Sequence, residues 1–123
     1  MKVLIADDHP LVRDALARAV RGLDAQVQVY EAGDLDTLLG EAADADLALI
    51  DLNMPGMDGL AGLHRLRALA PTLPVVVASG QDDAATIRAV LAAGAAGFIP
   101  KSERPEVLLS ALRLVQSGGT YVP

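Results

Sequence analysis

The chain carries four consecutive apolar residues at positions 47–50, immediately before Asp51. This run is too short to span a membrane and too apolar for a strand with one face in water, so it is typical of a strand buried on both faces. The Pro55-Gly56 pair then ends the strand and turns the chain. In open parallel sheets, binding sites form outside the carboxyl ends of the strands. We therefore expect a rigid element to hold Asp51 at such a site.

Short apolar runs alternate with helical patterns along the whole sequence. Strands are predicted at residues 2–6, 26–32, 47–50, 74–78 and 96–99. Helices, in which apolar residues recur every three or four positions, are predicted from Pro10 to Gly22, from Asp34 through Ala42, from Leu60 to Pro71, from Asp82 to Gly94 and from Pro105 to Gly118. This alternation favours an α/β domain with a parallel sheet and helices on both of its faces.

The composition excludes several classes of protein. A length of 123 residues suits one domain with one core. The net charge of −6 argues against nucleic-acid binding by this domain itself, because neutralising phosphates requires a basic face. The absence of cysteine excludes disulfides and thiolate metal sites. Since there is also no signal-peptide pattern and no apolar run of transmembrane length, we expect a soluble cytoplasmic protein without membrane association.

Polar side chains follow four of the five predicted strands. They are Asp7 and Asp8 after the first strand, Asp51 after the third, Ser79 after the fourth and Lys101 after the fifth. The second strand has no such ending and is expected at an edge of the sheet. Because the carboxyl ends of parallel strands meet at one rim, we expect three carboxylates, a hydroxyl and an ammonium to gather there.

Crowded carboxylates require a compensating positive charge. A like-charge pair about 4 Å apart costs roughly 4 kcal/mol at an effective dielectric constant of about 20. A hard divalent cation and the Lys101 ammonium can both offset this repulsion. Mg²⁺ prefers oxygen ligands and neutralises charge on a phosphoryl group during its transfer. The pattern therefore predicts a carboxylate nucleophile, a Mg²⁺ ion and a phosphoryl group held by the lysine and the hydroxyl.

Each of these residues also has a simpler interpretation. The two acids after the first strand could cap the following helix, Ser79 could belong to an ordinary turn, and Lys101 could be a solvated surface residue. Asp51 could begin a calcium loop, but the twelfth position of that loop is Gly62, where a bidentate glutamate is required. His9 has no second histidine at ligand spacing and is interpreted as a structural or surface residue.

Four motifs carry a resemblance to a known family. They are Asp-Asp-His-Pro-Leu-Val-Arg at 7–13, Asp-Leu-Asn-Met-Pro-Gly-Met-Asp-Gly at 51–59, Ser79 after a run of valines, and Gly-Ala-Ala-Gly-Phe-Ile-Pro-Lys at 94–101. With these motifs in this order, each at a strand end, the chain resembles a bacterial response-regulator receiver domain over essentially its whole length. The His-Pro-Leu-Val-Arg start and the Gly-Gly-Thr-Tyr-Val-Pro finish are most similar to the LuxR-type (NarL/FixJ) regulators.

The resemblance implies a fold, a domain division and partners. The fold would be flavodoxin-like and doubly wound, with five βα units and five parallel strands in the order 2-1-3-4-5. Residues 1–117 would form the receiver domain, and residues 118–123 would begin a linker to a helix-turn-helix output domain that this chain lacks. The implied partners are a sensor histidine kinase, a second copy of the chain on phosphorylation, and DNA only through the missing domain, which would control transcription.

The resemblance also assigns roles to the residues at the strand ends. Asp51 would accept a phosphoryl group from the kinase. Asp8, Asp51 and the backbone carbonyl of Asn53 would bind Mg²⁺, with Asp7 acting through water. Lys101 would pair with the phosphoryl oxygens. The expected chemistry is limited to self-phosphorylation and slow autodephosphorylation, so the domain is not expected to be an enzyme.

Two further residues would form the switch. Ser79 would hydrogen-bond the phosphoryl group and move towards it, and Phe98 would be the rotameric switch residue on the face that reports the change. Ser79 replaces the more frequent threonine of the family and keeps its hydroxyl, whereas Gly80 stands where alanine is more usual. Phe98 lacks the hydroxyl of tyrosine, so a switch here would work by packing alone.

Three other functions compete with this interpretation. An aspartate-nucleophile phosphatase of the haloacid-dehalogenase kind needs a second acid two residues after the nucleophile, where this chain has Asn53. A nucleotide-binding flavodoxin-like domain is disfavoured because neither a Gly-x-x-x-x-Gly-Lys nor a Gly-x-Gly-x-x-Gly segment is present. A degenerate receiver that only binds other proteins is disfavoured because the reactive positions are all intact.

Overall fold

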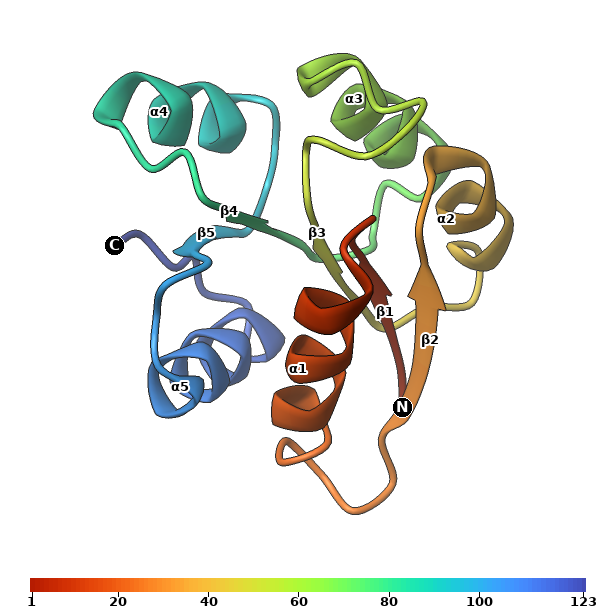
Figure 1. The fold of residues 1–123 in the computed structure, drawn as a ribbon, viewed down its shortest axis with the longest axis vertical. Helices are drawn as coiled ribbons and strands as arrows, with labels where there is room; N and C mark the ends of the chain where they lie inside the picture. The colour runs from red at the N-terminus through yellow and green to blue at the C-terminus, as the bar shows by residue number, and fades with distance from the viewer.

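The computed structural model describes residues 1–123 as one sheet with helices on both faces (Figure 1). Five parallel strands lie in the order β2-β1-β3-β4-β5, which confirms the predicted flavodoxin-like topology and the edge position of the second strand. The strands are β1 (Lys2–Ala6), β2 (Gln28–Ala32), β3 (Leu47–Ile50), β4 (Val75–Ser79) and β5 (Gly97–Pro100). The helices are α1 (Pro10–Val20), α2 (Leu35–Glu41), α3 (Leu60–Leu69), α4 (Ala84–Ala92) and α5 (Pro105–Gln116).

The sheet separates two apolar cores. Helices α2, α3 and α4 cover one face, and α1 and α5 cover the other (Figure 1). Since side chains alternate along a strand, each inner strand feeds both cores. The first core receives Leu4, Ala6, Ala48, Ile50, Val75, Val77 and Phe98 from the sheet. The second receives Val3, Ile5, Leu47, Leu49, Val76, Ala78 and Ile99. Burial on both faces explains why these strands are wholly apolar in sequence.

Local hydrogen bonds set the ends of the elements. Strand β2 begins two residues later than predicted, because Asp24 uses its side chain and its carbonyl to hold the N–H groups of Gln26 and Val27 in a turn. Helix α4 begins at Ala84 rather than at Asp82, since the Asp83 side chain accepts from the Thr86 N–H and caps the helix. These shifts leave the strand ends that carry the predicted site unchanged.

The last residues of the chain lie beside β5. The Tyr121 N–H donates to the Ala96 carbonyl at 3.0 Å, and the Phe98 N–H donates to the Tyr121 carbonyl at 3.2 Å. Gly97 is the bridge partner of Tyr121, and a side chain on Gly97 would meet the Tyr121 Cβ at 3.2 Å. The division between a domain of residues 1–117 and a linker from 118 stays a prediction. No helix is long and apolar enough to cross a bilayer.

Candidate functional site

Two carboxylates lie side by side at the carboxyl rim of the sheet. Strands β1 and β3 are neighbours, and Ala6 is paired with Ile50, so the residues that follow them, Asp7 and Asp51, emerge together. The Asp51 N–H donates to the Ala6 carbonyl at 2.8 Å, which continues the sheet pairing up to the acid. Both side chains are buried, with Asp7 at 0% and Asp51 at 1% exposure. The rigid sheet therefore fixes the distance between two charges that would otherwise repel.

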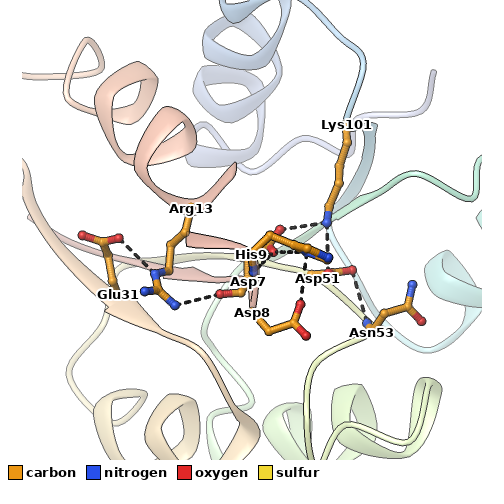
Figure 2. Close-up of polar contacts among 8 residues, drawn as sticks. All are labelled: Asp7, Asp8, His9, Arg13, Glu31, Asp51, Asn53 and Lys101. Carbon is orange, nitrogen blue, oxygen red and sulfur yellow. Dashed lines mark hydrogen bonds and ion pairs between the residues drawn. The ribbon is translucent and has the colours of Figure 1, made fainter. Parts of the chain in front are cut away.

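The Lys101 ammonium lies between these two carboxylates (Figure 2). Its Nζ is 2.8 Å from Asp7 Oδ2 and 3.0 Å from Asp51 Oδ2. A backbone hydrogen bond from the Lys101 N–H to the Ser79 carbonyl, at 2.9 Å, positions this lysine at the end of β5. The structure thus brings together three of the predicted site residues from strands far apart in the sequence.

The two charged partners shift each other's pKa. For Asp7, burial alone would raise the pKa, but the Lys101 ammonium and the N–H and ring of His9 lower it below its usual value. For Lys101, burial alone would lower the pKa, but the adjacent carboxylates of Asp7 and Asp51 raise it above its usual value. Both groups are therefore held in their charged forms at neutral pH.

The acidic residues form a group that could hold a divalent metal ion. One ligand atom from each of Asp7, Asp8, His9 and Asp51 lies within 4.8 Å of the others. The Lys101 contact with Asp7 Oδ2 is an ion pair without hydrogen-bond geometry, so this buried oxygen has no hydrogen-bond donor. A buried oxygen with spare coordinating capacity, among further carboxylate oxygens, fits the ligand preference of Mg²⁺.

Asn53 contacts Asp51 through its backbone N–H. Its N–H donates to Asp51 Oδ1 at 3.2 Å, so the chain folds back over the carboxylate (Figure 2). The loop that follows needs left-handed backbone at Gly56, Asp58 and Gly59, with φ of 86°, 49° and 60°. Glycine adopts such angles without strain, and aspartate tolerates them better than most residues. The Pro-Gly-Met-Asp-Gly sequence thus gives the loop its shape.

Ser79 lies at the end of β4 but does not contact Asp51. It is buried, and its hydroxyl accepts from the Gln81 N–H at 3.0 Å. It lines a cavity of about 200 Å³ that also touches Leu52, Asn53 and Val90, between the β3–α3 loop and α4. The hydroxyl therefore has open space beside it, towards the β3–α3 loop and α4.

Phe98 is fully buried in the core beneath α2, α3 and α4. Its exposure is 0%, so in this conformation its ring contributes nothing to the molecular surface. The sequence also allowed the interpretation of Phe98 as an ordinary core residue, and the packing is compatible with it. A switch role for Phe98 stays a prediction.

Two contacts at the site were not anticipated from the sequence. His9 is exposed, as expected of a surface residue, but its Nδ1 lies 2.9 Å from Asp7 Oδ1 and 3.1 Å from Asp8 Oδ1. Arg13 donates from Nη1 to the Asp7 carbonyl at 3.0 Å and from Nε to Glu31 Oε1 at 3.1 Å (Figure 2). For His9 the available signal was its position directly after two acids. For Arg13 there was none, because its partner Glu31 lies 18 residues away, on β2.

Comparison with known proteins identifies the family. Residues 3–113 match the response regulator receiver domain. The chain belongs to this family. The glycerol metabolism activator of Pseudomonas putida is 43% identical to this receiver over 125 residues, a match that covers 99% of the receiver and 57% of that protein. The chain therefore spans little more than half the length of this curated relative.

Solved structures share both the fold and the class of this receiver. A LuxR family DNA-binding response regulator from Silicibacter pomeroyi is 36% identical with a TM-score of 0.86, and the match covers 100% of this chain and 97% of that one. RcsB from Salmonella enterica serovar Typhimurium, solved bound to promoter rprA in the presence of the phosphomimetic BeF₃⁻, is 30% identical with a TM-score of 0.85. That match covers 97% of this chain and 62% of RcsB. The domain is thus a receiver of the LuxR type.

Proposed function

We propose that this receiver is a phosphorylation-controlled switch in which Asp51 accepts a phosphoryl group in a Mg²⁺-dependent reaction. The observation that carries this proposal is the Lys101 ammonium, 2.8 Å from Asp7 and 3.0 Å from Asp51, at the end of three different strands. Such a cation is placed to stabilise added negative charge on Asp51. Receiver domains are regulatory modules rather than classical enzymes, and turnover of a substrate is not part of this proposal.

The proposed step is a transfer of a phosphoryl group from a phosphohistidine donor. One carboxylate oxygen of Asp51 attacks the phosphorus, an O–P bond forms, the donor's P–N bond breaks, and the leaving imidazole takes up a proton from solvent. Asp51 needs no general base, because its carboxylate already carries the attacking electron pair. Lys101 pairs with the phosphoryl oxygens, and hydrolysis of the acyl phosphate by water slowly returns Asp51 to its free form.

The metal ligands in this proposal are residues of the acidic group. Asp8, Asp51 and the backbone carbonyl of Asn53 would hold Mg²⁺, and Asp7 would act through a bound water. When bound, the ion supplies neutralisation of the negative charge on the transferring phosphoryl group. Asp7 also orients Lys101, since the two form an ion pair of 2.8 Å.

The switch in this proposal uses the free space beside Ser79. A phosphoryl group on Asp51 offers strong acceptor oxygens, and Ser79 can exchange its present bond to the Gln81 N–H for a shorter, charge-assisted bond to that group. The cavity of about 200 Å³ next to Ser79 gives the β4–α4 segment room to shift. Phe98, two residues from the strand end that carries Lys101, would repack with it.

The proposed partners follow from the family. A sensor histidine kinase in the cytoplasm would donate the phosphoryl group, and phosphorylation would favour a homodimer. An output domain outside this chain would bind DNA and regulate transcription, since the net charge of −6 makes the receiver itself a poor DNA ligand. Size-exclusion chromatography with light scattering, with and without beryllofluoride and Mg²⁺, tests dimerisation. An unchanged monomer mass would contradict it.

The phosphoacceptor assignment can be tested by mass spectrometry of the intact protein. Incubation with acetyl phosphate and Mg²⁺ is expected to add the mass of one phosphoryl group, and removal of Mg²⁺ by EDTA is expected to prevent this. The Asp51→Asn variant should show no adduct. Asp58→Asn is the matched control, because Asp58 is an exposed acid in the same loop and should leave phosphorylation unchanged. An adduct that persists in Asp51→Asn would overturn the proposal.

A further inference from the structure

We infer that His9 supplies a nitrogen ligand to the metal ion held by the acidic group, and so biases the site towards divalent transition-metal ions relative to Mg²⁺. This inference rests on the proposed metal site but goes beyond it, because an oxygen-only site would have a weaker bias of this kind. It concerns one residue, the exposed histidine that directly follows Asp7 and Asp8. The ion bound at this site would be a divalent ion with affinity for imidazole, such as Mn²⁺, Co²⁺, Ni²⁺ or Zn²⁺.

The distances around the imidazole fit shared coordination. In an octahedral site with bonds of about 2.1 Å, adjacent ligand atoms lie about 3.0 Å apart and opposite ones about 4.2 Å apart. His9 Nδ1 lies 2.9 Å from Asp7 Oδ1 and 3.1 Å from Asp8 Oδ1, which are separations of adjacent ligands. The whole group, Asp51 included, lies within 4.8 Å. An ion in this group can therefore contact the ring nitrogen and an oxygen of Asp8, small side-chain movements bring in Asp51, and Asp7 acts through a bound water as proposed above.

The backbone presents the ring to the acids. His9 is the residue before α1, with extended backbone at φ −98° and ψ 105°, and Pro10 is the first residue of the helix. Its N–H donates to Asp7 Oδ1 at 2.8 Å, which closes a tight turn between the two residues. The side chain makes no capping bond to the helix. Figure 2 shows the ring joined to the carboxylates of Asp7 and Asp8.

A second feature shows that the group has unused coordinating capacity. The Asp7 side chain is completely buried, and the one partner of its Oδ2 is the Lys101 ammonium, 2.8 Å away and without hydrogen-bond geometry. One ammonium beside two buried carboxylates leaves net negative charge in the group, and a metal ion would offset it. The competing explanation of the ring position is a plain hydrogen bond or ion pair between His9 and the acids, which requires no nitrogen–metal bond.

Metal preference distinguishes the two explanations. Mg²⁺ binds oxygen and keeps its waters, so removing an imidazole should affect its affinity little. Divalent ions later in the first transition series gain progressively from nitrogen ligands. If His9 is a ligand, its loss should lower Ni²⁺ affinity by about tenfold or more, since even indirect support of a metal is worth 10–100-fold. If it is only a counter-ion, its loss should change both affinities alike.

The experiment uses the intact chain with Mg²⁺, Mn²⁺ and Ni²⁺ as probes. Isothermal titration gives the Ni²⁺ to Mg²⁺ affinity ratio, and pulsed electron paramagnetic resonance of bound Mn²⁺ detects a directly bonded ¹⁴N nucleus. The variants are His9→Gln and His9→Ala. His64→Gln is the matched control, because His64 is the other histidine of the chain and lies exposed on α3. Circular dichroism verifies that each variant is folded.

The expected result is a ¹⁴N signal in the wild type and in His64→Gln that is absent from both His9 variants, together with a reduced Ni²⁺ to Mg²⁺ ratio. Metal binding without a ¹⁴N signal in the wild type, or with an unchanged ratio in the His9 variants, would overturn the role of His9 alone. Failure of the wild type to bind Mg²⁺, or binding that survives Asp51→Asn unchanged, would instead overturn the proposed metal site. The two failures are thus separable.

Discussion

At the scale of single residues, Lys101 compensates the repulsion between two buried acids. Replacing it with methionine keeps the apolar stem and leaves Asp7 and Asp51 facing each other without the ammonium. Because the lysine side chain is 20% exposed, the loss should be smaller than for a fully buried pair, and we expect Lys101→Met to lower the free energy of unfolding by about 1–3 kcal/mol. Urea denaturation without metal measures it.

Added Mg²⁺ provides the specific readout for Lys101→Met. A divalent ion between the same carboxylates should restore part of the lost stability in the variant and stabilise it more than the wild type. Arg18→Met is the control, since Arg18 forms an exposed pair with Asp14 of 2.6 Å on the surface of α1 and should contribute at most about 0.5 kcal/mol. Equal losses in the two variants, or no recovery with Mg²⁺, would contradict the compensating role.

Residue types and strand endings were enough to predict which acids and which cation would meet. Asp7, Asp51 and Lys101 each follow an apolar strand, and parallel topology puts all such endings at one rim. The orientation of the side chains could not be predicted from residue types and strand endings. The Ser79 hydroxyl bonds to Gln81 rather than facing Asp51, and the His9 ring turns onto the acids, because both depend on turn geometry of a few residues.

At the scale of elements, the start of α3 packs directly against the loop that carries Asp51. A methyl group on Gly62 would meet the Met57 carbonyl oxygen and sulfur at 2.7 Å and its Cα at 2.8 Å. Met57 is fully buried, so it cannot move aside freely. We expect Gly62→Ala to lower the free energy of unfolding by about 1–3 kcal/mol and to weaken Mg²⁺ binding through displacement of the loop.

Gly40→Ala is the matched control for this helix substitution. Gly40 is an exposed helical position in α2, and nothing lies within 4 Å of an added methyl group. Alanine should therefore raise the free energy of unfolding by roughly 0.5–1 kcal/mol through helix propensity alone. Chemical denaturation and Mg²⁺ titration of both variants measure these effects. If the Gly62→Ala protein is as stable as the wild type, the loop does not depend on the close contact between Gly62 and Met57.

Two helix caps should contribute to loss of stability in acid. Asp34 accepts from the Thr37 N–H at the start of α2, and this bond lowers the Asp34 pKa below 3.8. Asp83 accepts from the hydroxyl and the N–H of Thr86 at the start of α4, which lowers the Asp83 pKa in the same direction. Since both pKa values are lower in the folded state, the caps stabilise above the unfolded-state pKa and are lost as the pH falls through the folded-state values.

The Asp34→Asn/Asp83→Asn double variant tests this acid dependence. Asparagine keeps a capping acceptor but does not titrate, so the variant should lose less stability than the wild type as the pH falls from about 4. Denaturation at a series of pH values gives the two slopes. Identical slopes would show that the caps are not responsible, and that other carboxylates, Asp7 among them, dominate acid unfolding.

The same caps show what sequence could and could not predict about elements. Asp34 and the Asp82-Asp83 pair were recognisable as helix starts, because aspartate before a periodic apolar segment is a strong signal. The pairing of Tyr121 with β5 had no such signal. It depends on a short stretch of backbone that follows Gly118-Gly119 and returns to the sheet, and glycine-rich sequence alone indicates only a turn or linker.

At the scale of the whole molecule, a backbone hydrogen bond connects Phe98, the proposed switch residue, to Tyr121. The Phe98 N–H donates to the Tyr121 carbonyl, so a backbone change at β5 on phosphorylation should reach Tyr121 directly. The chain has no tryptophan and two tyrosines, and the other one, Tyr30, lies on β2. In a Tyr30→Phe variant, intrinsic fluorescence therefore reports Tyr121 alone. We expect beryllofluoride with Mg²⁺ to change this emission.

Two truncations determine whether the pairing of Tyr121 with β5 also stabilises the domain. Ending the chain after Gly118 removes both backbone hydrogen bonds to Tyr121, and we expect a loss of about 1–3 kcal/mol in the free energy of unfolding. Ending it after Tyr121 removes only the exposed Val122 and Pro123 and should cost little. Hydrogen exchange should show loss of protection at the Phe98 amide in the first truncation and not in the second. If that amide stays protected in both truncations, the Tyr121 contact does not stabilise β5. If Tyr121 emission does not change when beryllofluoride occupies Asp51, Tyr121 does not respond to the state of the site.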